Sequence, residues 1–245
     1  MPNEIKRPDV ELSNRPLHFF WLVDCSGSMY GSKIDTLNAA ISNSIKPMQD
    51  AAASNVNAQL LVRTLKFATG ASWLTADPVP VEEFAWQDLT IDDYAVTDMG
   101  KAFELLAAQL DMPPMPNRAL PPVIVLVSDG QPVDDWKRPL EKLKGMPWFR
   151  KAVKMAVAIG GDADKDVLAA FTGNRELIFD ANHPQRLVDL IRWLSTDVVT
   201  HHSNPTPNPL PMPEPTPEPD PLPAPDELSL SVNSILDLPI PDDVW

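Results

Sequence analysis

Hydrophobic residues follow two distinct periodicities along residues 17–198. Two runs, 17–23 and 122–127, are hydrophobic at nearly every position, which is typical of strands buried on both faces of a parallel sheet. In residues 34–48 and 99–110, hydrophobic side chains instead recur every three or four positions, as on one face of a helix. The pattern therefore predicts strands that alternate with helices.

Weaker versions of the same patterns predict the remaining elements. Strands are expected at residues 56–67, 153–159 and 177–179, and helices at 133–143, 167–171 and 187–198. Residues 73–84 are expected to form a broken or edge strand, because Pro78 and Pro80 cannot donate to a central ladder. Pro47 is expected to kink or end the first helix, because it removes a hydrogen bond. Together these elements predict an α/β fold: a doubly wound, mostly parallel central sheet with helices on both faces.

The composition divides the chain into four parts. Residues 1–15 are polar and predict a flexible lead-in, and residues 16–202 hold the predicted folded domain. Residues 203–227 form a proline-rich acidic linker, in which every odd position from 205 to 225 is proline. Such a sequence favours an extended polyproline-type spacer. Residues 228–245 are a tail too short to be a domain.

The charge and the cysteine content limit the partners and the compartment. The 245-residue chain has a formal net charge of −14 and no Lys/Arg-rich stripe, so nucleic acids and membrane surfaces are not expected partners. Residues 1–16 lack the hydrophobic core of a signal peptide, and no run approaches the roughly 20 residues of a membrane span. The single cysteine, Cys25, fits a reducing compartment. We expect a cytoplasmic protein in which Cys25 is buried rather than redox-active.

Hard oxygen donors follow the predicted strands and precede a predicted helix. They are Asp24, Ser26, Ser28, Thr97 and Asp129. Ligands of an open α/β sheet bind at the carboxyl ends of its strands, so we expect these side chains to meet at one edge. Carboxylate and hydroxyl oxygens suit Mg²⁺ first, with Mn²⁺ or Ca²⁺ possible, and disfavour zinc.

The spacing within the first group supports this interpretation. Residues two apart in an extended loop point the same way, so Asp24, Ser26 and Ser28 would face one point. Neutral hydroxyl ligands would leave the ion under-neutralised, with an open position for a carboxylate from another molecule. The alternative is that these residues merely cap the first helix. Asp98 is expected to be a first-turn residue favoured by the helix dipole rather than a ligand.

This set of five residues, in this order, resembles the metal-ion-dependent adhesion site (MIDAS) of von Willebrand factor type A (vWA) domains. The resemblance spans residues 15–200 and implies the vWA fold, which is Rossmann-like. It also implies that the three hydroxyl side chains ligate the ion directly and that the two carboxylates do so directly or through water. An acidic residue of a partner protein would then take the last position.

The segments around Asp24 and Asp129 look most like the bacterial TerY-type branch. That branch is named for tellurite resistance and is typically found with a phosphatase and a protein kinase. The resemblance implies a stress-response or phosphosignalling role with such partners encoded nearby. Some of these proteins carry a C-terminal cysteine-rich metal-binding module, and here the proline-rich linker and the tail stand in its place.

We therefore expect a non-catalytic, metal-dependent protein-binding adaptor. The alternative is a metal-dependent hydrolase or phosphatase on the same doubly wound architecture. The chain has no G-x-S-x-G motif and no glycine-rich phosphate loop. Phosphatases with an aspartyl nucleophile need a second carboxylate two residues on, and Ser26 stands there after Asp24.

The tail offers a second candidate contact. Its candidate residues are Leu236, Asp242, Asp243 and Trp245. A tryptophan at the end of an acidic tail has no core to join and is suited to anchoring a partner, whereas the alternative is a solvated tail without function. A related hypothesis is that a tail carboxylate occupies the open metal position when no partner is bound.

Overall fold

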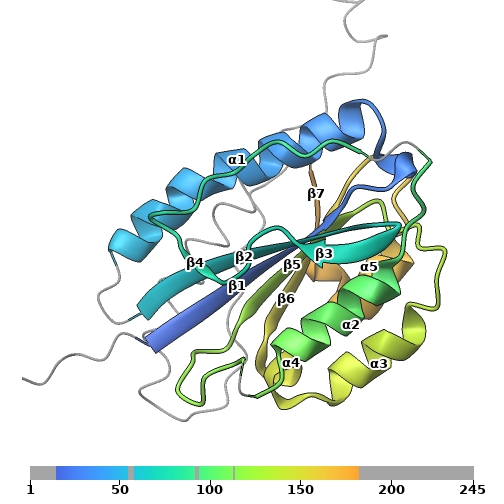
Figure 1. The fold of residues 1–245 in the computed structure, drawn as a ribbon. Helices are drawn as coiled ribbons and strands as arrows, with labels where there is room; N and C mark the ends of the chain where they lie inside the picture. The colour runs from blue at the N-terminus through green and yellow to red at the C-terminus, as the bar shows by residue number, and fades with distance from the viewer. Residues whose placement is uncertain (1–14, 55–57, 92–93, 113, 182–245) are drawn as a thin grey trace, which may run out of the picture. The chain divides into compact units, whose positions relative to one another are not determined.

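The central strand of the sheet is Arg15–Asp24, β1, which is buried from Leu17 to its last residue. The structure, a computed structural model, describes residues 15–54, 58–91, 94–112 and 114–181. Within these residues one seven-stranded sheet has the order β3-β2-β1-β5-β6-β7, with β4 also paired to β2 (Figure 1). The other strands are β2 Ala58–Ala68, β3 Gly70–Trp73, β4 Val79–Pro80, β5 Val123–Ser128, β6 Val153–Ala158 and β7 Ile178–Asp180.

The sheet is mostly parallel, as predicted. β1 pairs in parallel with β2 and β5, and β5–β6 and β6–β7 are parallel as well. Only β3 and β4 run antiparallel, both on β2. Of the broken or edge strand expected at 73–84, only Trp73, at the end of β3, and the two residues of β4 are in strands. Pro80 lies in β4, where no further strand needs its missing N–H.

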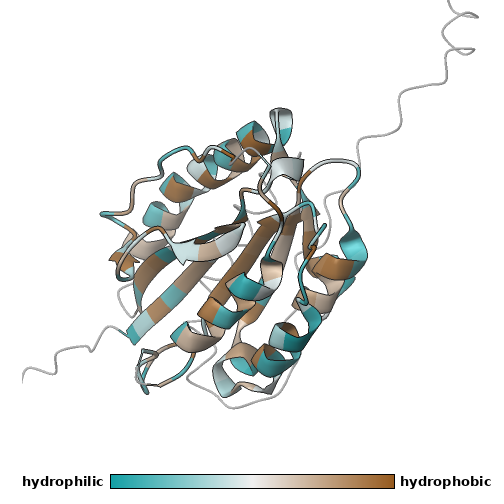
Figure 2. Ribbon diagram, turned by 45° about the vertical axis from the view of Figure 1, so that its right-hand side comes forward, coloured by the Kyte–Doolittle hydropathy of each residue, from teal (hydrophilic) through white to brown (hydrophobic). Residues whose placement is uncertain are grey.

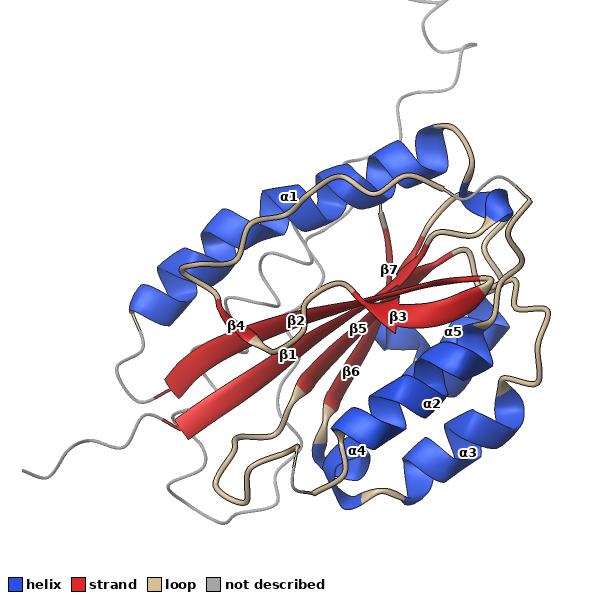
Figure 3. Ribbon diagram, viewed as in Figure 1, coloured by secondary structure: helices blue, strands red, loops and turns tan. Residues whose placement is uncertain are grey.

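Helices cover both faces of the sheet, which confirms the predicted α/β architecture (Figure 3). The helices are α1 Ser32–Ala53, α2 Met99–Gln109, α3 Lys137–Gly145, α4 Pro147–Lys151 and α5 Lys165–Thr172, with 3-10 turns at Gly27–Met29 and Arg175–Leu177. α1 lies on one face, and α2 to α5 lie on the other. Within the described ranges, no helix combines the length and the hydrophobicity needed to cross a membrane.

Alternate residues of β1 build two separate cores. Phe19 and Trp21 pack in the cluster that contains Leu37 and Ile41 of α1. Residues such as Phe20 pack in the other cluster, with α2 and its neighbours. Both faces of the strand are therefore hydrophobic, as the nearly continuous run predicted, and Figure 2 shows the central strands as mostly hydrophobic.

Several predicted boundaries were wrong. α1 continues through Pro47 to Ala53, because its buried face, with Met48 at 0 % exposure, packs on the sheet on both sides of the proline. The helix expected at 133–143 begins only at Lys137: Val133 is in a loop, where its amide donates to the Thr97 carbonyl at 3.0 Å. The short helix α4 was not predicted.

Some predictions lie outside the described residues. These are the lead-in up to residue 14, the helix at 187–198, the linker at 203–227 and the tail with Leu236, Asp242, Asp243 and Trp245. They stay predictions.

Candidate metal centre

The candidate centre lies where the strand order reverses. From β1 the chain adds β2 on one side, whereas β5, β6 and β7 extend the sheet on the other. Val23 and Val127 are register partners in the β1–β5 pair. Asp24 therefore ends β1 beside the end of β5, at the switch point where open α/β sheets bind ligands.

The first loop brings its three oxygen-bearing side chains together. The Ser26 amide donates to Asp24 Oδ1 at 3.0 Å, and the hydroxyls of Ser26 and Ser28 lie 3.1 Å apart. Asp24 and Ser26 are fully buried, and Ser28 is exposed. The loop thus presents a graded set of donors, from a buried carboxylate to a hydroxyl at the surface.

These side chains do not cap the first helix. The residue that precedes α1 is Gly31, which has no side chain. Ser26 precedes the 3-10 turn, and its side chain makes no capping hydrogen bond. The capping alternative therefore does not account for the two serine hydroxyls.

The last residue of β5, Ser128, bonds Asp24 from the other side. The Ser128 hydroxyl donates to Asp24 Oδ2 at 2.6 Å and accepts from the Gly130 amide at 2.9 Å. Asp129 is fully buried, and the Gln131 amide donates to its Oδ1 at 3.3 Å. Ser128 was missed as a site residue, although its place at the end of a hydrophobic strand, next to Asp129, was a usable signal.

Thr97 lies in a segment tied to both loops. The Gly27 amide donates to the Ala95 carbonyl at 2.9 Å, and the Thr97 carbonyl accepts from Val133. Thr97 is buried. Asp98 stands just before α2, but its carboxylate accepts from the Gly70 amide at 2.8 Å and makes no capping bond to the helix.

Burial sets the electrostatics of the centre. It raises the pKa of Asp24 to about 6, against the hydrogen bonds from Ser128 and Ser26, and the charge of Asp129 raises this pKa further. The charge of the fully buried Asp129 thus adds to the cost of charging Asp24. A cation nearby would offset this cost.

A lysine of α1 supplies one positive charge. Lys33 Nζ lies 3.1 Å from Asp129 Oδ2 and 2.9 Å from Asp162 Oδ2. Partial burial lowers the pKa of Lys33, but the bonds to Asp162 and Asp129 outweigh it and leave the pKa raised. The sequence carried no signal for this contact, because the paired residues are 96 and 129 positions apart.

Solved structures resemble the fold, whereas no protein-family model and no curated protein matches the chain. A vWA protein from Catenulispora acidiphila has a TM-score of 0.51 at 16% identity, over 75% of this chain and 43% of its own. The ArnB paralog VWA2 from Sulfolobus acidocaldarius gives 0.51 at 16% identity, over 73% and 44%. Proximal thread matrix protein 1 of the mussel byssus, with a zinc-occupied MIDAS motif, gives 0.52 at 12% identity, over 74% and 48%.

The chain has the vWA fold. It spans less than half the length of each of these three structures. In this fold the five predicted ligands lie at the end of β1 and in the segment that follows it, before α2, and directly after β5.

The donors of this vWA fold fit a hard divalent cation. The described residues contain no group of three or more His, Cys, Asp and Glu side chains placed to hold a metal ion. The predicted ligand set does not count as such a group, because it has only two carboxylates and its other donors are Ser and Thr hydroxyls. Oxygen donors without sulfur or imidazole suit Mg²⁺. Cys25 is buried, as predicted.

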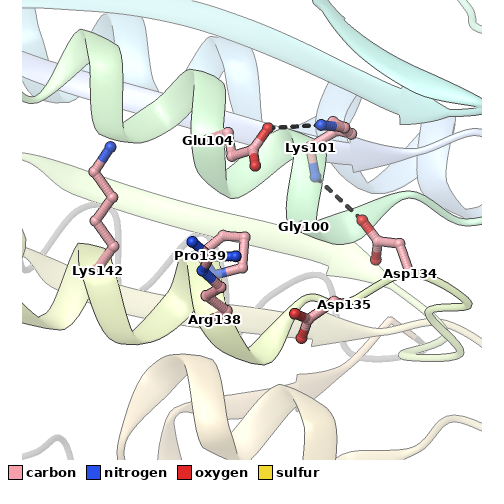
Figure 4. Close-up of a pocket in the computed structure, with 8 residues that line it drawn as sticks. All are labelled: Gly100, Lys101, Glu104, Asp134, Asp135, Arg138, Pro139 and Lys142. Atoms are coloured by element: carbon pink, nitrogen blue, oxygen red, sulfur yellow. Dashed lines mark hydrogen bonds and ion pairs between the residues drawn. The ribbon is translucent and has the colours of Figure 1, made fainter.

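A cavity of about 600 Å³ lies between α2 and α3. Gly100 and Lys101 of α2 line it together with the 134–135 segment and α3, and the Lys101 amide donates to Asp134 (Figure 4). None of the five predicted ligands lines this cavity. It is therefore separate from the candidate metal centre.

Proposed function

We propose that this protein is a non-catalytic adaptor that binds a divalent cation and uses it to grip an acidic residue of a partner protein. The ion would be held by Asp24, Ser26, Ser28, Thr97 and Asp129. One observation carries the proposal: the loop after β1 places the two serine hydroxyls 3.1 Å apart, next to a fully buried aspartate, at the switch point of the sheet.

The donor chemistry favours Mg²⁺, with Mn²⁺ or Ca²⁺ as further candidates. The zinc-occupied MIDAS motif of the mussel protein supports a divalent site at this place in the fold. It also makes Zn²⁺ a necessary comparison in any binding experiment. When bound, the ion would supply a positive charge that the neutral hydroxyl donors leave only partly neutralised.

This residual charge defines the partner chemistry. A carboxylate of another protein can complete the coordination, so the partner would present an exposed Asp or Glu. Because the sequence resembles the TerY-type branch, we propose a phosphatase and a protein kinase as the partners. A cytoplasmic stress response, such as tellurite resistance, is the proposed setting.

The surroundings of the serine hydroxyls support a binding role over a catalytic one. Ser26 and Ser28 contact each other. Of the chain's four histidines, the described residues include only His18, which is buried inside β1. No Ser–His pair of a hydrolase is present in that part of the chain.

Calorimetry with Mg²⁺, Mn²⁺ and Zn²⁺ tests the metal site. Asp24→Ala should weaken Mg²⁺ binding at least about tenfold, because it removes a buried anionic donor. Asp50→Ala is the matched control: its carboxylate pairs with Lys46 on the surface of α1, away from the centre, so affinity should not change. Equal affinities of wild type and Asp24→Ala would contradict the proposal. Metal-dependent hydrolysis of a phosphomonoester that is lost in Ser28→Ala would instead favour the enzymatic alternative.

A further inference from the structure

Lys33 contacts the candidate centre from outside the predicted ligand set. Its ammonium is shared between Asp129, a fully buried predicted ligand, and Asp162, whose side chain is 61% exposed. The Lys33 side chain itself is only 18% exposed. One cation therefore joins a buried carboxylate of the centre to a carboxylate at the surface.

The local backbone makes room for this bridge. A Cβ on Gly160 would lie 2.6 Å from Lys33 Cε and 2.6 Å from Asp162 Oδ1, and Gly160 has a φ of +85°. Both the space and the conformation thus require glycine. The lysine stem lies against the bare backbone of Gly160, which follows β6 by two residues.

Two cations, the metal ion and the Lys33 ammonium, would bind the Asp129 carboxylate. In the proposed function Asp129 serves a divalent ion, while its Oδ2 already accepts a hydrogen bond from Lys33. An ammonium beside a ligand repels the incoming ion and occupies one of the ligand's acceptor sites. Asp162 offers Lys33 a second, solvent-exposed acceptor within hydrogen-bond distance.

We infer that Lys33 competes with the metal ion for Asp129. Lys33 neutralises Asp129 when no ion is bound, and it pairs with Asp162 alone when the ion binds. The inference rests on the proposed metal-binding function and deepens it. Lys33 acts here as a positioning residue: it sets the affinity of the centre for cations and supplies a positive charge to the buried carboxylates in the ion's absence.

Three variants and a control test this by calorimetry with Mg²⁺ and by thermal unfolding in chelator. Lys33→Met should tighten Mg²⁺ binding on the order of tenfold, because a repelling unit charge is removed. It should also lower the melting temperature of the metal-free protein, because the buried Asp129 loses its ion-pair partner. Lys165→Met is the control: Lys165 pairs with Asp180 at the surface, and its loss should leave Mg²⁺ affinity within about twofold of wild type.

Asp162→Asn separates the exchange from a simple charge effect. Without the negative charge of its second partner Lys33 stays on Asp129, so Mg²⁺ binding should weaken several-fold in the wild-type background. In the Lys33→Met background the same substitution should have almost no effect, which makes the two changes strongly non-additive.

The outcomes are distinguishable from those of the proposed function. If wild type and Lys33→Met bind Mg²⁺ with the same affinity, the competitor role of Lys33 is overturned, but the proposed metal site is not. An effect of Asp162→Asn that persists unchanged without Lys33 also overturns it. Absence of binding by both wild type and Lys33→Met overturns the metal site and the inference together.

Discussion

Asp24 combines a chemical role with full burial. Its two oxygens accept hydrogen bonds from different segments, Oδ1 from the Ser26 amide after β1 and Oδ2 from the Ser128 hydroxyl at the end of β5. Burial raises its pKa to about 6, which shows that these bonds only partly offset the loss of water. Ser128 in turn accepts from the Gly130 amide, so one hydroxyl serves both the carboxylate and the turn after β5.

Ser128→Ala should therefore destabilise the protein. It leaves Asp24 Oδ2 without its donor and the Gly130 amide without its acceptor, at a cost of about 1–3 kcal/mol in the free energy of unfolding. Urea denaturation in chelator measures this. Ser44→Ala is the comparison: its equally buried hydroxyl donates to the Ile41 carbonyl at 2.6 Å and has a weak contact with Met48 Sδ at 4.0 Å, both within α1, so the loss should stay below about 1 kcal/mol. Equal effects of the two substitutions would contradict the role given to Ser128.

At the scale of elements, burial made the strands predictable. The runs that form β1 and β5 are hydrophobic throughout because both faces of these strands are covered. The start of α3 was not predictable from the same pattern, because Val133 looks like a helix position but is 66% exposed in a loop. Tertiary hydrogen bonds, such as that from Val133 to Thr97, decide this boundary.

α1 contains a correctable weakness at Pro47. The proline lies inside the helix, where it removes one backbone hydrogen bond and costs about 3 kcal/mol relative to alanine. Pro47→Ala should stabilise the protein by roughly 1–2 kcal/mol, because the freer unfolded chain takes back part of the gain. Urea denaturation measures the change.

Pro147→Ala is the control for Pro47→Ala. Pro147 is the first residue of α4, a position that needs no N–H partner and where the fixed φ of proline is already suitable. This substitution should give no gain, or a small loss. A comparable gain from both changes would show that the position within the helix is not the cause.

At the scale of the whole molecule, all five candidate ligands were named from the sequence, whereas two long-range contacts of the centre were not. Asp24, Ser26 and Ser28 lie within one loop, so their spacing already indicated that they face one point. The hydrogen bond from Ser128 depends on the β1–β5 register. The contact of Lys33 depends on a side chain that reaches across 96 residues of sequence. Neither relation is encoded by a local pattern.

His18 gives the stability of the whole fold a pH dependence. It is buried in β1, with neither ring nitrogen hydrogen-bonded within the described residues. Burial first, and then the charge of Arg63, lowers its pKa from 6.5 to about 4. Between these values the unfolded chain binds a proton that the folded chain does not. The contribution of His18 is therefore fully present above pH 6.5 and is lost as the pH falls towards 4.

His18→Phe removes this titration and keeps a ring that can stack on Phe20, whose centroid lies 5.8 Å from that of His18. From pH 7 to pH 4, the unfolding free energy of the variant should rise relative to wild type by about 3 kcal/mol. Urea denaturation at several pH values in chelator measures this difference. Asp24, whose pKa is raised, works in the opposite direction, but it is present in both proteins and cancels in the comparison. A difference that stays constant from pH 7 to pH 4 would mean that His18 is protonated to the same extent in the folded and unfolded chains.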